Sequence, residues 1–225
     1  MYSHTLQRAP DRGKGTFSQA YHGGDQEDAI AVEIGARLLQ ARRERGLSVR
    51  ALAAEVGVSG ALISQIETGR TQPSVSTLYA LVEHLGVSLD WLVGRDEVDR
   101  RAAPAAALAA GRPVTPAGEH PVLRIANGVS WEVAISRIDG SVDAVLVSYE
   151  PGASSSDTEE AAVHTGHEHA VLVVGELTLV LDGERHAVRA GDSISFDSSR
   201  PHRYVNEGTV PARGVWLSSG QDYPG

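Results

Sequence analysis

Residues 48–70 read SVRALAAEVGVSGALISQIETGR, and this stretch contains two short apolar repeats on either side of Gly57. The repeats have helical spacing and comprise Leu52, Ala53 and Val56 before the glycine, then Leu62, Ile63 and Ile66 after it. Ser48 and Ser59 stand immediately before the two repeats, where a helix favours a serine cap. The stretch therefore predicts two helices joined by a tight turn, with Val58 filling the space between them.

The flanking sequence extends this helical pattern. Ile34, Leu38 and Leu39 recur at helical spacing upstream. Glycines that are typical of helix ends stand at positions 46, 57, 69 and 86. Either Ser74 or Ser76 is placed to cap a further helix. We expect a helical domain over residues 30–94.

The second predicted helix of the pair leaves one face free of large side chains. This face comprises small or neutral polar residues: Gly60, Ala61, Ser64 and Gln65. In a DNA major groove, small side chains meet thymine methyl groups and glutamine binds adenine through two hydrogen bonds. The pattern predicts a helix-turn-helix that reads double-stranded DNA.

The run GVSxxxISQIExGRxxPS at residues 57–74 resembles the Xre/Cro-like bacterial repressors, and the likeness covers about 60 residues. The resemblance implies a five-helix, lambda-repressor-like domain in which Arg42 pairs with Glu67. It also implies the set of DNA-binding residues Arg42, Arg50, Ser59, Gly60, Ala61, Ser64, Gln65, Thr68 and Arg70. One copy reads few base pairs, so a homodimer on a palindromic operator is expected. The alternative left open is a helical bundle that kept the fold and lost DNA binding.

The net charge of −9 is unfavourable for a nucleic-acid partner only if it is spread evenly. From Glu119 onward there are sixteen acidic and seven basic residues, whereas residues 33–93 carry six of each. The acidity therefore belongs to the second half. No cysteine and no membrane-length apolar run occur, and the polar N-terminus has no secretory pattern, so we expect a cytoplasmic protein without a membrane partner.

After about residue 121 the period of the apolar residues changes to two. VDAVLVSY, HAVLVVGELTLVL, RHAV and DSISF are separated by short turns, and Asp182-Gly183 is a strong hairpin signal. Many short strands with glycine-rich turns favour a β-barrel. We expect a disordered tail at residues 1–29, a linker at 95–118 and the barrel at 119–225.

Three of the nine histidines lie within six residues, and a fourth follows in SRPHRYVN. His164, Glu168 and His202 are two imidazoles and a carboxylate, a set that holds Fe, Zn, Ni or Mn on one face. Residues of equal parity share one face of a strand, so His167 and His169 are expected to point outward. The sequence predicts a divalent metal site at the three residues.

The second half resembles the cupins, jelly-roll barrels built as a double-stranded β-helix. Two cupin motifs carry the likeness: His164, Glu168 and Gly175, then Gly191, Asp197, Ser199, His202 and Asn206. Ala162 stands where most metal-binding cupins have a further histidine. Residues placed to line the barrel are Trp131, Tyr149, Tyr204 and Trp216, with Arg124 or Arg137 available to an anionic ligand. Many regulatory cupins bind an organic ligand without metal, and that alternative stays open.

The two halves together allow two functions. The order of helix-turn-helix and cupin resembles a family of one-component transcriptional regulators whose barrel senses a small-molecule effector, with no catalysis. HTGHE followed by PHR also resembles hydroxypropylphosphonate epoxidase, an iron enzyme that uses His, Glu and His. The near-complete DNA-reading face favours the regulator, because an enzyme has no need of such a face.

Overall fold

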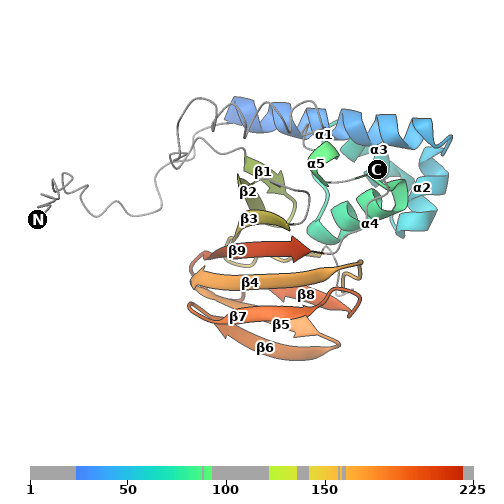
Figure 1. The fold of residues 1–225 in the computed structure, drawn as a ribbon. Helices are drawn as coiled ribbons and strands as arrows, with labels where there is room; N and C mark the ends of the chain where they lie inside the picture. Colours follow the sequence, from blue (N-terminus) through green and yellow to red (C-terminus); the bar gives the residue numbers. More distant parts are fainter. Residues whose placement is uncertain are drawn as a thin grey trace, which may run out of the picture.

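In the computed structural model, the described residues are 24–87, 89–92, 122–135, 142–156, 158 and 161–219. A helical domain precedes a β-barrel (Figure 1). The helices are α1 (Gly24–Glu44), α2 (Val49–Val56), α3 (Gly60–Glu67), α4 (Val75–Leu85) and α5 (Leu89–Leu92). The first helix starts at Gly24, so the tail expected at residues 1–29 overlaps it, since apolar periodicity marks only the packed part of a helix. Residues 1–23 and the linker expected at 95–118 lie outside the described residues.

Serine caps define where the short helices begin. The side chains of Ser48 and Ser59 each accept a hydrogen bond, from the backbone amides of Ala51 and Leu62, both at 3.1 Å. Ser74, rather than Ser76, caps α4 by accepting from the amide of Thr77 at 3.2 Å. The chain turns by 110° between α2 and α3, within the range of a helix-turn-helix.

The crossing of α1 and α3 depends on one glycine. A Cβ built on Gly35 of α1 would lie 2.4 Å from the carbonyl oxygen of Ile66 and 2.9 Å from that of Glu67. Both atoms are backbone, so they have no side-chain freedom with which to move aside. Gly35 therefore sets how closely α3 approaches α1.

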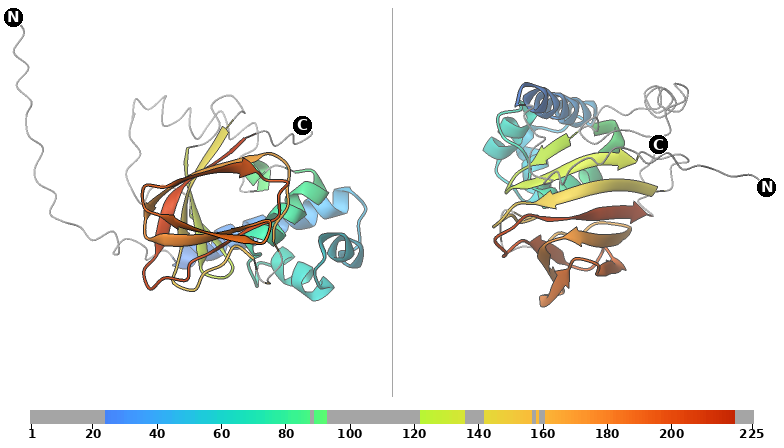
Figure 2. Two further views of the ribbon diagram at one scale, coloured as in Figure 1. Left: turned by 90° about the horizontal axis from the view of Figure 1, so that it is seen from below. Right: turned by 90° about the vertical axis from the view of Figure 1, so that its left-hand side faces the viewer.

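The barrel consists of two facing sheets (Figure 2). Its strands are β1 (Val122–Ile125), β2 (Val129–Ile135), β3 (Val142–Tyr149), β4 (His167–Val174), β5 (Glu176–Leu181), β6 (Glu184–Arg189), β7 (Ser193–Asp197), β8 (His202–Val205) and β9 (Ala212–Ser219). The larger sheet has the order β1-β2-β3-β9-β4-β7 and the smaller β6-β5-β8. The predicted hairpin turn joins β5 to β6 with positive φ at Asp182 (53°) and Gly183 (82°). This is the backbone that a two-residue hairpin requires.

Helix α4 lies between the two domains. Its buried residues cover more than half of its circumference: Val75, Thr77, Leu78, Tyr79, Leu81, Val82 and Leu85. Two backbone hydrogen bonds join this region to the barrel, from the Ser76 amide to the Ser155 carbonyl at 3.1 Å and from the Ala126 amide to the Pro73 carbonyl at 3.0 Å. Buried residues of both domains form one continuous apolar core.

Among the described helices, none by itself is long and apolar enough to cross a membrane; α2 and α3 meet that measure only when taken together as a bent pair.

The close crossing at Gly35 yields a stability prediction. Gly35→Ala is expected to lower the free energy of unfolding by about 1–3 kcal/mol, because overpacking a close contact forces the backbone apart. Urea unfolding followed by far-ultraviolet circular dichroism measures the change. The control is Gly60→Ala, whose new methyl would meet only a Val49 side-chain carbon at 3.7 Å. Equal stability of the two variants would contradict the role given to Gly35.

Candidate functional site

The outward face of α3 is exposed as the sequence predicts. Ile63 and Ile66 are buried in the helical core, whereas Ser64 and Gln65 are exposed to solvent. Around them the other residues expected at DNA are also exposed, namely Arg50, Ser59, Ala61, Thr68 and Arg70, with Gly60 half-buried. Ser59 caps the N-terminus of this helix. The exposed face of α3 is therefore a ridge of small and neutral polar side chains, as the sequence predicts.

Arg42 and Glu67 form the buried ion pair that the resemblance implies. The Arg42 Nε and Nη2 atoms donate to the two carboxylate oxygens of Glu67 at 2.5 and 2.8 Å, and Nη1 donates to the Leu47 carbonyl at 2.7 Å. Both residues are 8% exposed. Arg42 is therefore placed as a brace between α1 and the end of α3, and its guanidinium does not face solvent.

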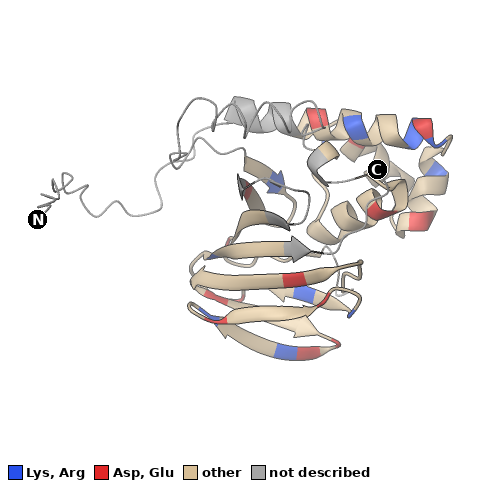
Figure 3. Cartoon of the chain, viewed as in Figure 1, with Lys and Arg blue, Asp and Glu red and all other residues tan. Residues whose placement is uncertain are grey.

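Charge is distributed as the sequence count indicates. Figure 3 shows basic and acidic residues interspersed on the helices. Arg43, Arg45 and Arg50 are exposed near the junction of α1 and α2, and Arg70 is exposed just after α3. Of these arginines, Arg45 donates to the His84 carbonyl at 2.8 Å, and Arg50 and Arg70 are exposed on the two segments that flank α3 in the chain.

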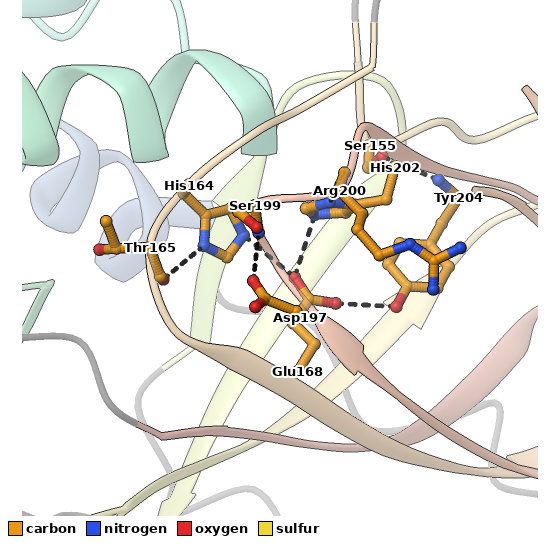
Figure 4. A network of polar contacts seen from close by, with 9 residues as sticks. All are labelled: Ser155, His164, Thr165, Glu168, Asp197, Ser199, Arg200, His202 and Tyr204. Atoms are coloured by element: carbon orange, nitrogen blue, oxygen red, sulfur yellow. Dashed lines mark hydrogen bonds and ion pairs between the residues drawn. The ribbon is translucent and has the colours of Figure 1, made fainter. Parts of the chain in front are cut away.

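The second candidate site lies inside the barrel, where His164, Glu168 and His202 converge (Figure 4). Their potential ligand atoms all lie within 4.8 Å of one another, and each residue is at most 5% exposed. Glu168 comes from β4 in the larger sheet and His202 from β8 in the smaller sheet. His164 lies before β4, on a loop that turns at Gly166 with φ of 100°. The set therefore joins both sheets, and His164 reaches it from a loop rather than from the strand itself.

Hydrogen bonds fix the orientation of both imidazoles. Nδ1 of His164 lies 3.1 Å from the carbonyl oxygen of Thr165. Nδ1 of His202 lies 2.8 Å from the carbonyl oxygen of Arg200. A carbonyl only accepts, so each Nδ1 carries the proton. Each Nε2 then points at the Oε1 atom of Glu168, at 3.2 Å from His164 and 3.3 Å from His202. Such second-shell bonds are typical of histidines that bind metals.

The donor set fits a divalent metal. When both Nε2 atoms are deprotonated, they and the carboxylate oxygen are three electron-pair donors that converge on one position, as a cation requires. Ligands about 2.1 Å from a common ion lie about 3.0–3.4 Å from each other, close to the separations here. Tyr204 donates its hydroxyl to the other carboxylate oxygen, Oε2, at 2.7 Å. Oε1 is therefore the oxygen left for a metal.

Protonation follows the same geometry. Burial acts to raise the pKa of Glu168, but the hydrogen bonds and charges of His164 and His202 outweigh it and lower the pKa to about 2. Burial acts to lower the pKa of His202, yet its contacts with Glu168 outweigh this and raise it. The carboxylate of Glu168 is therefore ionised at neutral pH, and its charge favours the protonated form of His202.

The remaining cupin residues have structural positions. Asn206 is fully buried and donates to the carbonyls of Tyr149 and Val210 at 2.8 and 2.9 Å. Asp197 accepts from the Ser199 amide at 2.9 Å in the turn before β8. His167 is exposed and His169 is half-buried, contacting Ser195 at 3.0 Å on the outer face. The outward direction predicted for these two histidines is confirmed.

The aromatic residues expected in the pocket line the barrel interior. All four are buried: Trp131, Tyr149, Tyr204 and Trp216. The rings of Tyr149, Tyr204 and Trp216 form one cluster, with centroids 5.6–6.2 Å apart. Arg124 is exposed on β1, and Arg137 lies outside the described residues.

Sequence reasoning missed Tyr79. This residue belongs to α4, yet its ring stacks on that of His164 with centroids 4.1 Å apart and an interplanar angle of 6°. It also contacts Trp131, with centroids 5.9 Å apart. In the sequence Tyr79 is only one member of an apolar helical stripe, so nothing there indicates a contact with the other domain.

Comparison with known proteins matches both halves. A helix-turn-helix family model matches residues 38–92 and a cupin-domain model matches residues 145–218. The HTH-type transcriptional regulator PuuR of Escherichia coli K12 is 26% identical over 174 residues, covering 76% of this chain and 86% of PuuR. The uncharacterized HTH-type transcriptional regulator y4dJ of Sinorhizobium fredii NGR234 is 42% identical over 55 residues, covering 24% of this chain and 71% of y4dJ.

A solved structure shares the overall fold. The crystal structure of an HTH_3 family transcriptional regulator from Vibrio cholerae aligns with a TM-score of 0.59 at 20% sequence identity. The alignment covers 86% of this chain and 98% of that one. The likeness therefore extends over both the helical domain and the barrel.

The buried pair gives a prediction for the helical domain. Arg42→Met or Glu67→Leu alone is expected to cost about 3–5 kcal/mol of unfolding free energy, because each leaves one buried charge without its partner. The double variant is expected to recover most of that loss, which urea unfolding of all four proteins measures. Additive losses in the double variant would show that the two side chains act independently.

Proposed function

The chain belongs to the HTH-type transcriptional regulators, with a helix-turn-helix domain followed by a cupin domain, and we propose that it is a one-component regulator whose barrel senses a small molecule or a metal. The exposed ridge of α3 carries the DNA-reading half of this proposal. The convergence of His164, Glu168 and His202 carries the sensing half.

Base reading is assigned to the ridge of α3. The exposed amide of Gln65 presents a donor and an acceptor side by side, the arrangement that recognition of adenine through two hydrogen bonds requires. Ser64 and Ala61 are small enough to let the helix approach the base edges. Arg50, Thr68 and Arg70 are proposed to contact phosphates, and Arg42 to act indirectly, by holding Glu67 and the end of α3 in place.

The operator is proposed to be palindromic and bound by a homodimer. A single α3 presents few base-reading side chains, so a two-fold pair of helices supplies the specificity that one copy lacks. The recognition helix itself contains no lysine or arginine. The few phosphate contacts predict a shallow salt dependence of binding. This role places the protein in the cytoplasm, with access to the chromosome.

The barrel is proposed to bind a divalent metal, with a small-molecule effector at the open side of that metal or in its place. Two imidazoles and one carboxylate suit iron, zinc, nickel or manganese. When bound, such an ion supplies a Lewis-acidic centre to which an oxygen- or nitrogen-bearing effector binds. The three side chains that would hold the ion are oriented by hydrogen bonds, His164 by the Thr165 carbonyl, His202 by the Arg200 carbonyl and Glu168 by the Tyr204 hydroxyl.

We propose that the chain regulates without catalysing a reaction. The relatives matched by sequence, PuuR among them, are named transcriptional regulators. The alternative of an iron epoxidase uses the same kind of His, Glu and His set, so the barrel alone does not separate the two functions. The exposed polar ridge of α3 favours the regulator.

Replacing the polar side chains on the exposed face of α3 tests whether this helix reads the DNA bases. Gln65→Ala combined with Ser64→Ala is expected to weaken specific binding at least about tenfold, because each lost base contact removes about 1–3 kcal/mol. Genomic fragments selected by the wild-type protein provide the target, and fluorescence anisotropy measures the affinity. Ser195→Ala on the exposed face of β7 is the control, with unchanged affinity expected. Unchanged binding by the double variant would exclude α3 as the reading helix.

Tyr204 offers a test of the metal site that spares its three ligands. Tyr204→Phe removes the hydrogen bond to Oε2 of Glu168 and is expected to weaken zinc binding by about 10–100-fold, as for other second-shell groups. Isothermal titration calorimetry measures the change. Tyr149→Phe, in the same aromatic cluster, is the control and should keep its affinity, whereas His164→Ala should lose binding. Full zinc binding by His164→Ala would place the metal elsewhere.

A further inference from the structure

We propose that Tyr79 links the metal site in the barrel to the recognition helix, so that occupancy of the site changes DNA affinity through the stacking of Tyr79 on His164. This inference rests on the proposed function and names its means of regulation. The contact is direct: the two rings are almost parallel, at a centroid distance of 4.1 Å. Tyr79 is 9% exposed and His164 is 4% exposed, so solvent is largely excluded between them.

The ring of His164 is the ligand ring whose orientation the helical domain controls. Its Nδ1 is held by the Thr165 carbonyl and its Nε2 faces Glu168. One face of the ring is covered by Tyr79, while His202 approaches with its ring at 77° and a centroid distance of 5.0 Å. A cation that attracts Nε2 therefore shifts the ring of His164. The ring of Tyr79, which is stacked on it, has to move with it.

A second chain of contacts leads from the same site to the same helix. Glu168 accepts a hydrogen bond from the hydroxyl of Tyr204. The backbone amide of Tyr204 donates to Oγ of Ser155 at 3.0 Å. In return, the amide of Ser155 donates to the carbonyl of Tyr204, also at 3.0 Å. The Ser155 carbonyl then accepts from the amide of Ser76 in the first turn of α4 at 3.1 Å. Glu168 and His164 thus reach α4 at two points, Ser76 and Tyr79, one turn apart.

Helix α4 is able to pass a displacement on to the DNA-reading surface. Ser74 caps it only seven residues after Glu67, the last residue of α3. Leu78, Leu81 and Leu85 of α4 are each at most 1% exposed, within a core that includes Ile63 and Ile66 of α3. Close-packed cores respond to a shift by moving as units, so a change at Tyr79 alters how α3 sits relative to the barrel.

The first test needs no operator. Hydrogen exchange of the full-length protein is measured with and without zinc alone. Zinc is expected to slow exchange in α4 by at least about threefold, as well as in β4 and β8, because the stacked ring is fixed. His164→Ala should abolish the effect in all three elements. Protection confined to β4 and β8 in the wild-type protein would overturn the proposal, even if every Tyr79 variant failed to fold.

The second test measures coupling. In the wild-type protein, zinc is expected to change the affinity for a selected genomic fragment by about fivefold or more. Tyr79→Phe keeps the stacked ring and should keep this ratio. Tyr79→Leu keeps an apolar side chain of moderate size without the ring, and its ratio should fall to within about twofold of one, with zinc still bound.

The outcomes separate the two proposals. A wild-type protein that selects no DNA contradicts the proposed function. In that case the hydrogen-exchange measurement still decides whether zinc at the barrel site affects α4 through Tyr79. A wild-type protein that responds to zinc, together with Tyr79→Leu that responds equally, overturns the role of Tyr79 and leaves the regulator intact. A wild-type affinity that ignores bound zinc contradicts both the metal-sensing role and the link.

Discussion

The rest of the molecule depends on helix α4 being buried from two sides. Its leucines complete the core of the helical domain, and Tyr79 completes the wall of the barrel. Helix α1 contacts the barrel as well, at β1, so the two domains meet along two helices. Because the stripe of α4 covers more than half of its circumference, the domains share one core, and the orientation of α3 is set relative to the barrel.

Within the barrel, the constraint is electrostatic. Three electron-pair donors point to one position, and the Nδ1 hydrogen bonds prevent either imidazole from turning its N–H toward Glu168. If both Nε2 atoms are deprotonated, three buried lone pairs face one another, an arrangement that a cation at their common position stabilises. The two carbonyls that accept from Nδ1 belong to Thr165 in the loop before β4 and to Arg200 in the turn before β8. The orientation of the imidazoles therefore depends on the backbone of these two segments. The chemistry of the site and the path of the chain around it are therefore linked.

Much of the fold and of both sites could be predicted from sequence, because the signals were local. The cap at Ser59, the turn at Asp182-Gly183 and the apolar spacing of α3 each act within a few residues. The Arg42–Glu67 pair followed from a family resemblance, since the spacing of 25 residues carries no physical signal by itself.

What could not be predicted was the arrangement between the domains. Tyr79 appears in the sequence as an ordinary apolar position of a helix, and its contact with His164 spans 85 residues of chain. Parity along a strand placed Glu168 correctly, but it treated His164 as part of the same strand, whereas the turn at Gly166 delivers that residue from a loop. Strand periodicity describes neither loops nor docking surfaces.

The two domains that share this core differ in charge. The second half of the chain, from Glu119 onward, is strongly acidic, while the helical domain is balanced, so phosphates are repelled by the barrel and tolerated by the side that carries α3. In the proposed link through Tyr79, a small rotation of α4 would change the angle between the barrel and α3. In the proposed homodimer, the rotations in the two protomers would add and would change the spacing between the two α3 helices. The proposed palindromic site requires a fixed spacing of those helices.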